Sequence, residues 1–224
     1  MKSLLVCADA VVRGELPVAT THSLKRIVTQ LLAVIVLFGS LYGAAMGSFG
    51  GIGGDCLLQV LYSAIKVPLL LLATFALSLP SFFIFNTLRG LREDFPQALR
   101  ALLASQSGLT VLLASMAPLT LLWNISATGH EAAILFNALV FGIATLGGQV
   151  LLRRYYQTLL VRDDRHIRML RLWGVVYAFV GIQMGWILRP FVGDPGKPIT
   201  FVRDESWGNA YVAVFQLLVH VFRP

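Results

Sequence analysis

The chain has 224 residues, of which 57% are hydrophobic and only 13% are charged. Soluble domains carry about 25% charged residues, so this composition excludes an ordinary soluble domain and indicates a membrane protein. The net charge of +7 does not point to nucleic acid as a partner. The arginines cluster beside apolar segments, where the positive-inside rule of membrane proteins accounts for them.

Residues 1–26 mix basic, acidic and apolar side chains and predict a cytoplasmic N-terminal segment. Apolar residues between Leu4 and Val12 recur at helical spacing, which favours a short helix on the inner membrane surface, with a frayed tail as the alternative. The first long apolar segment begins at Ile27 and is too long for the core of a signal peptide. We therefore expect an uncleaved membrane anchor there.

Apolar segments long enough to cross a bilayer recur along residues 27–193 and predict an all-α fold. We expect one polytopic bundle of about five transmembrane helices, with interfacial helices beside it. The expected spans are residues 27–50, 68–88, 102–123, 131–152 and 172–188.

The apolar segment 55–88 has about 34 residues, which as a helix is roughly 50 Å and too long for one straight span. Lys66 and Pro68 are expected to divide it. Residues 55–66 then predict a re-entrant or interfacial helix, and Pro68 opens the second span. Pro80 is expected to kink that span.

Small residues recur at helical spacing in several spans. Gly43, Gly47 and Gly51 predict a face on which another helix packs closely; a dimer contact and a glycine-rich turn are the alternatives. Gly181 and Gly185 predict a similar packing face in the fifth span. Spans one, four and five are therefore expected to pack most tightly.

The distribution of basic residues predicts the orientation. Thirteen of the 18 Lys and Arg residues fall on the side of the N-terminus, and five fall on the other side. Because basic residues concentrate on the cytoplasmic side, we expect the N-terminus inside and the C-terminus outside.

The tail, residues 194–224, is expected on the outer face. Aromatic and apolar residues from Trp207 to Phe222 share one helical stripe. Residues 209–222 span about 21 Å as a helix, which is short for a membrane crossing. They predict an amphipathic interfacial helix, and a sixth span is the alternative.

The most distinctive motif is W-x-L-R-P-F-x-G-x-P, which covers residues 186–195. Together with the strings at residues 62–68, 79–83 and 207–211, it resembles a family of bacterial multispan membrane proteins with no established activity. That family is similar in size and span number to Yip1-type proteins. The resemblance implies a bacterial cytoplasmic-membrane protein and no catalytic residues.

Four residues around this motif are candidates for an outer-face contact with a partner protein or lipid: Trp186, Arg189, Phe191 and Trp207. Arginine and aromatic residues are the types enriched in binding hot spots. The alternative for Arg189 is an anchor at the membrane surface or a structural pair with Asp194.

Two other kinds of site are disfavoured. Asp163, Asp164 and His166 include metal-ligand types, but the arginines beside them would repel a cation, so a solvated loop is expected and no metal or other cofactor. The span centres hold amides such as Asn137 and Gln183 rather than ionisable groups, which disfavours a transporter.

These patterns predict a non-catalytic subunit or organiser of a membrane assembly. Its expected partners are the lipid bilayer and other membrane proteins, without nucleic acid. A small channel or transporter is the alternative, and a membrane-embedded enzyme is a weaker one.

The orientation can be tested by cysteine labelling in intact cells. Cysteines placed in residues 153–171 should be shielded from a membrane-impermeant thiol reagent, whereas a cysteine replacing Gly196 should react. Labelling of residues 153–171 from outside would contradict this topology.

Overall fold

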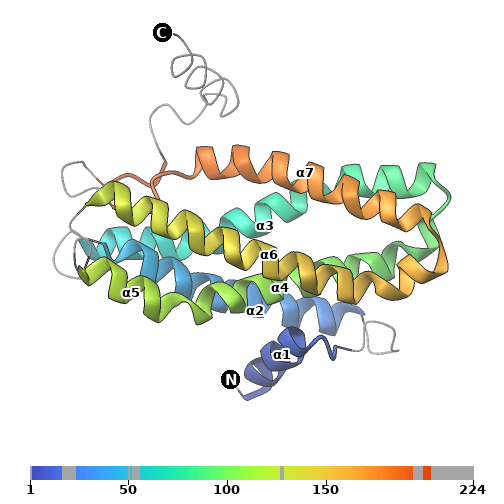
Figure 1. The fold of residues 1–224 in the computed structure, drawn as a ribbon, viewed down its shortest axis with the longest axis horizontal. Helices are drawn as coiled ribbons and strands as arrows, with labels where there is room; N and C mark the ends of the chain where they lie inside the picture. Colours follow the sequence, from blue (N-terminus) through green and yellow to red (C-terminus); the bar gives the residue numbers. More distant parts are fainter. Residues whose placement is uncertain are drawn as a thin grey trace, which may run out of the picture.

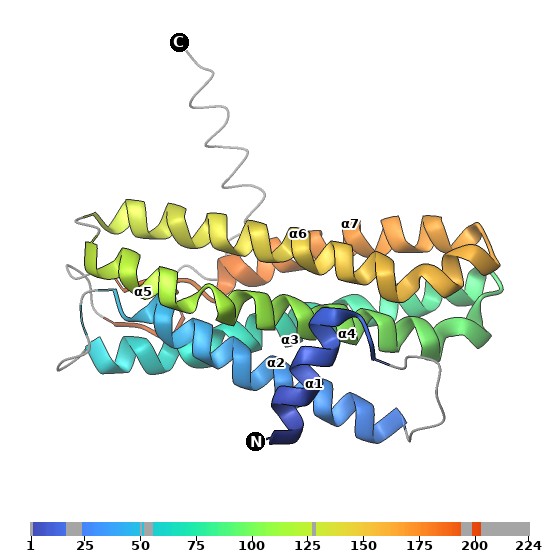
Figure 2. The same cartoon turned by 60° about the horizontal axis from the view of Figure 1, so that its bottom comes forward.

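The computed structural model describes residues 2–16, 24–49, 51, 56–126, 129–193 and 199–202, and in these ranges the protein is helical without strands. Long helices run side by side in one elongated bundle (Figures 1 and 2). The elements are α1 (Lys2–Arg13), α2 (Leu24–Gly47), α3 (Cys56–Leu88), the 3₁₀ turn η1 (Arg92–Asp94), α4 (Phe95–Ser115), α5 (Ala117–Ser126), α6 (His130–Arg162) and α7 (Arg165–Ile187).

Five of these segments are long and apolar enough to cross a membrane: α2, α3, the consecutive α4 and α5, α6 and α7. The prediction of an all-α, five-span bundle is confirmed, and the protein is a multi-pass integral membrane protein. We call the end of the bundle that holds the α6–α7 turn the inner end, and the opposite end the outer end.

The expected division of the second apolar segment is wrong. Helix α3 is continuous from Cys56 to Leu88, with Pro68 and Pro80 both inside it. Membrane helices tolerate such prolines where neighbouring groups satisfy the freed backbone. A left-handed Gly90 then ends the helix, because the amide of Leu91 donates to the carbonyl of Asn86 across that turn.

Close packing against α2 explains why the Lys66–Pro68 region stays helical. A Cβ added to Gly43 would lie only 2.9 Å from the Cα of Ala64, and one added to Gly47 would lie 2.8 Å from the Cβ of Ser63. Gly39 lies in the same way against Pro68. The backbones of α2 and α3 therefore approach closely over about two helical turns, from Gly39 to Gly47.

Gly51 does not belong to this contact. Its φ of 110° lies in the left-handed region, and among the described residues no atom lies within 4 Å of a Cβ built there. Of the three glycines predicted to form a packing face, Gly51 instead meets the backbone requirement of a turn.

Of the three spans expected to pack most tightly, span one does so, because α2 packs closely against α3 and α4. Span four, α6, packs against α4, whereas the expectation is wrong for span five: α7 packs against α3 and is the least buried of the five spans. The spacing of small residues identifies a face for close approach, but it does not say which helix will occupy that face.

Helix α1 crosses the side of the bundle formed by α2 and α4 (Figure 2). Cys7, Ala8 and Val11 are buried, and the hydroxyl of Tyr155 on α6 donates to the carbonyl of Val11 at 2.7 Å. The opposite face exposes Val6 and other apolar side chains. This two-sided apolar character fits a helix that lies between the bundle and the membrane surface.

The glycine contact can be tested by Gly43→Ala. The added methyl group would overlap the backbone of α3, and such overpacking typically costs about 1–3 kcal/mol of unfolding free energy. The thermal stability of the protein in mild detergent should therefore fall.

Gly142→Ala is the matched control, because the Cβ site of Gly142 on α6 is open among the described residues. Its stability should be unchanged or higher, since alanine favours a helix. Equal stability of the two variants would contradict the packing role of Gly43.

Candidate functional site at the outer end of α7

Helix α7 ends where the sequence predicts. The helix extends to Ile187, Leu188 caps it, and Pro190 follows. Residues 189–193, which we call the outer segment, have no regular secondary structure and lie against α3. A non-helical backbone packed against other segments needs partners for its carbonyl and amide groups, because an unpaired buried polar group is costly.

Helix α3 provides these partners through one row of polar side chains. Gln59, Ser63 and Lys66 lie at i, i+4 and i+7 and therefore share one face of the helix, and all three are buried. The hydroxyl of Ser63 donates to the carbonyl of Phe191 at 2.5 Å, and the amide of Gln59 donates to the same oxygen at 3.2 Å. We call these three residues the α3 polar row.

Lys66 makes the strongest of these contacts. Its ammonium group donates to the carbonyl of Pro190 at 2.7 Å and to that of Thr200 at 3.2 Å. The rings of Tyr62 and Phe201 pack edge-on against each other beside this ammonium group, with centroids 5.8 and 5.2 Å from Nζ. The fully buried cation thus joins the outer segment to the later residues 199–202.

This role of Lys66 was not predicted, because residues 55–66 were expected to form a separate re-entrant or interfacial helix. The pattern that indicates the role is the i, i+4, i+7 spacing of Gln59, Ser63 and Lys66 on that helix. The spacing shows that the three polar side chains share a face, but it does not show that the face is buried against residues 190–200.

The structure separates the four candidate contact residues. The guanidinium carbon of Arg189 lies 3.7 Å from the centroid of the Trp186 ring, so these two side chains form a cation–π pair at the end of α7. Phe191 instead packs partly buried against the outer part of the core, beside Val192. Trp207, like the predicted helix over residues 209–222, lies outside the described residues.

Helix α7 has little cover along its outer two thirds. Its buried residues are His166, Met169 and Trp173, and no described residue from 174 to 187 is buried. A Cβ on Gly181 would meet Thr74 of α3 at 3.4 Å, whereas one on Gly185 would meet no described atom within 4 Å. Gly185 therefore makes no close contact with a described residue, and its packing role stays a prediction.

Two polar pairs join the helices in the interior. The hydroxyl of Tyr42 donates to the Asn137 amide oxygen at 2.9 Å, and that of Tyr177 donates to Gln106 at 2.9 Å. Asn137 is one of the amides noted at the span centres in the sequence, whereas Gln106 was not singled out. Its signal is an amide within an apolar span, flanked by Ser105 and Ser107.

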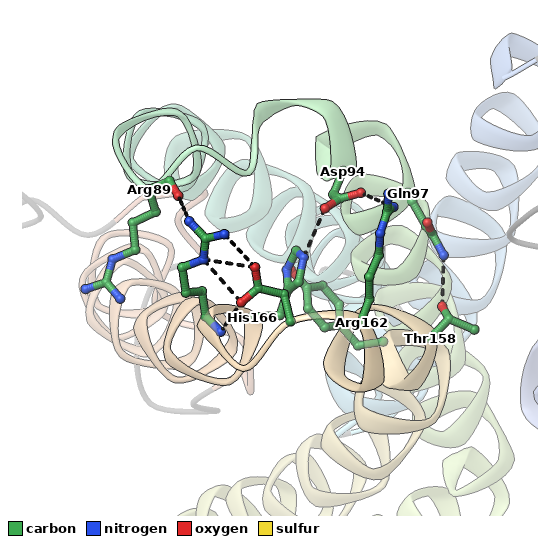
Figure 3. A network of polar contacts seen from close by, with 9 residues as sticks. Arg89, Asp94, Gln97, Thr158, Arg162 and His166 are labelled. Atoms are coloured by element: carbon green, nitrogen blue, oxygen red, sulfur yellow. Dashed lines mark hydrogen bonds and ion pairs between the residues drawn. The ribbon is translucent and has the colours of Figure 1, made fainter.

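A second polar network closes the inner end (Figure 3). One carboxylate oxygen of Asp94 accepts from Arg162 at 2.7 Å, and the other lies 3.2 Å from the buried ring of His166. The opposite ring nitrogen of His166 lies 3.5 Å from the hydroxyl of Tyr156. Asp94 thus connects the start of α4 to both α6 and α7.

The same network engages the residues considered as metal ligands. Asp163 binds the guanidinium of Arg165 at 2.8 Å, and Arg165 also donates to the carbonyl of Arg89 at 3.0 Å (Figure 3). The hydrogen bonds from Arg165 hold the pKa of Asp163 below its usual range. Asp163 and His166 are thus engaged in protein contacts, which fits a structural turn.

Compared with known proteins, the chain matches no family model, no curated protein and no solved structure. Helix α7 is held at one end by the inner network and at the other end by the α3 polar row, through the outer segment. Its outward-facing side between these ends is exposed.

Lys66→Met should loosen the outer segment. The substitution keeps an apolar stem but leaves the Pro190 and Thr200 carbonyls without their donor, and an unpaired buried polar group costs about 1–3 kcal/mol. In a protein whose native cysteines are serine, a cysteine replacing buried Val192 should then react with a maleimide about tenfold faster.

Lys25→Met is the matched control, because Lys25 is exposed near the start of α2. It should leave the reactivity at position 192 unchanged. Equal rates in the two variants would show that Lys66 does not hold the outer segment.

Proposed function

We propose that this protein is a non-catalytic subunit or organiser of a membrane protein assembly, and that it docks a partner on the outer part of α7. The observation that carries the proposal is the exposed outward-facing side of α7, at Val175, Phe179 and Ile182, on a helix whose two ends are fixed. Fixed ends mean that a partner would meet a preformed surface and pay little ordering entropy.

The chemistry of that surface suits another membrane helix. Val175, Phe179 and Ile182 are exposed and apolar, and Gly185 allows a second backbone to approach closely. Arg189, stacked on Trp186, lies at the outer end of the same helix, where a planar cation can bind a carbonyl or a carboxylate of the partner.

The proposed location is the cytoplasmic membrane of a bacterium, with the N-terminus inside. The excess of arginine at the inner end supports the orientation. The resemblance of the motif at residues 186–195 to a bacterial family supports the membrane.

A small channel or transporter is the second candidate, and the α3 polar row is the observation that favours it. A buried lysine beside a non-helical segment within the bundle resembles the way transporters build ion and substrate sites. Solute flux into liposomes that contain the purified protein, abolished by Lys66→Met or Gln183→Leu, would replace the assembly proposal.

The docking proposal can be tested with a photo-crosslinking residue at Ile182, which is exposed on α7. In native membranes it should give a discrete adduct with a protein, and Gly185→Leu should reduce the yield several-fold by blocking close approach. Neither change touches a described packing contact of the bundle.

The controls lie on α6. A crosslinker at exposed Leu146 should give no such adduct, and Gly142→Leu, at an equally open glycine, should leave the Ile182 adduct unchanged. Lipid adducts alone at Ile182, or equal losses with both leucine variants, would contradict docking on α7.

A further inference from the structure

The outward side of α7 forms one stripe that is basic at its inner end and apolar beyond it. Val175, Phe179 and Ile182 are 68%, 58% and 53% exposed and follow one another at steps of four and three residues. Arg168 and Arg171 extend the same stripe toward the inner end at steps of three and four residues, and both are exposed. Helix α7 lies along the upper edge of the bundle in Figure 1, with α3 as its main neighbour.

The two arginines of this stripe face away from the bundle. Arg171 lies about 140° around the helix from His166 and about 160° from Trp173, which are both buried. None of the ion pairs among the described residues includes Arg168 or Arg171, whereas Arg165, one turn earlier, is paired. Both guanidinium groups therefore lie where a neighbouring molecule would meet them.

A second copy of this chain does not suit the stripe. Copies of a membrane protein share one orientation, so a symmetric pair would place two α7 helices in parallel, with each position of the stripe opposite itself. Arg168 and Arg171 would then face the same two arginines of the second copy, and like charges within an interface disfavour binding. The complementary surface is acidic where this stripe is basic and apolar where it is apolar.

We propose that the partner of α7 is a membrane-spanning helix of a different protein, with Asp or Glu residues at its inner end opposite Arg168 and Arg171. This inference rests on the proposed docking on α7 and specifies the chemistry of the partner. A carboxylate binds a guanidinium group through two parallel hydrogen bonds, which fixes the register of the two helices. Because basic residues dominate the cytoplasmic flanks of membrane helices, acidic ones there distinguish this partner from most other helices.

Small residues beside the stripe favour a helix over lipid chains as the occupant. Ala178 is exposed, and a Cβ on Gly185 would meet no described atom within 4 Å. The two residues are seven positions apart and therefore share one side of the helix. Small residues in this arrangement let the backbone of a second helix approach closely, a property that fluid acyl chains do not require.

A photo-crosslinking residue at exposed Ile182 identifies the partner segment in native membranes. Mass spectrometry of the adduct should show a membrane-spanning segment of a different protein, with Asp or Glu about three to four helical turns inward of the crosslinked position. Arg168→Gln/Arg171→Gln should lower the yield of the adduct about fivefold, which is the combined value of two exposed ion pairs.

Arg92→Gln/Arg153→Gln is the matched control, because it removes the same charge from two exposed arginines outside the stripe. The yield of the Ile182 adduct should stay at the wild-type level. Equal losses in the two double variants would show a diffuse charge effect and would overturn the acidic partner.

A charge exchange tests the pairing directly. Arg168→Glu/Arg171→Glu should abolish the adduct, and changing the acidic residues of the identified partner to arginine should restore it, which also shows that the variant is folded. No recovery would overturn the pairing. A protein adduct that contains a second copy, or that is insensitive to Arg168→Gln/Arg171→Gln, would overturn the acidic partner but leave docking on α7 in place. Lipid adducts alone would overturn the docking itself.

Discussion

The need to satisfy every backbone polar group inside the membrane governs the outer half of this protein. Residues 189–193 leave the helical conformation, and their carbonyls would have no donor in lipid. Lys66, Ser63 and Gln59 provide those donors from one face of α3. These three side chains can act together only if their segment is helical and buried. Helix α3, which is continuous from Cys56 to Leu88, meets both conditions.

Close contact between α2 and α3 gives that face its position. Gly39, Gly43 and Gly47 let α2 approach the backbone of α3 directly opposite residues 59–68. Larger side chains there would move α3, and with it the donors that hold the outer segment. The glycines of α2 and the polar side chains of α3 therefore both stabilise the position of the outer segment. The glycines do so through α3, and the polar side chains do so by direct hydrogen bonds.

At the inner end, ion pairs decide which charges remain available. Asp94 and Asp163 neutralise Arg162 and Arg165 and fix the turn between α6 and α7. The same turn places α7 against α3 and leaves the outward-facing side of α7 exposed.

Apolar length and the positions of charged residues were sufficient to predict the five spans and the end of α7. These properties act locally, because a span must be long and apolar enough for the bilayer, and because an arginine followed by proline favours a helix end at the membrane surface. The stacking of Arg189 on Trp186 also follows from neighbours in sequence. Even the close approach along Gly43 and Gly47 could be predicted as a packing face.

Only the tertiary structure decided which elements meet. Lys66 bonds to carbonyls more than 120 residues away, and Gln106 to a tyrosine 71 residues away. The local sequence around Lys66 or Gln106 does not predict which distant residue it will contact. The continuity of α3 through Pro68, the open position of Gly185 and the separation of α6 from α7 likewise depend on packing between distant segments, because local propensity is weaker than the contacts a folded bundle provides.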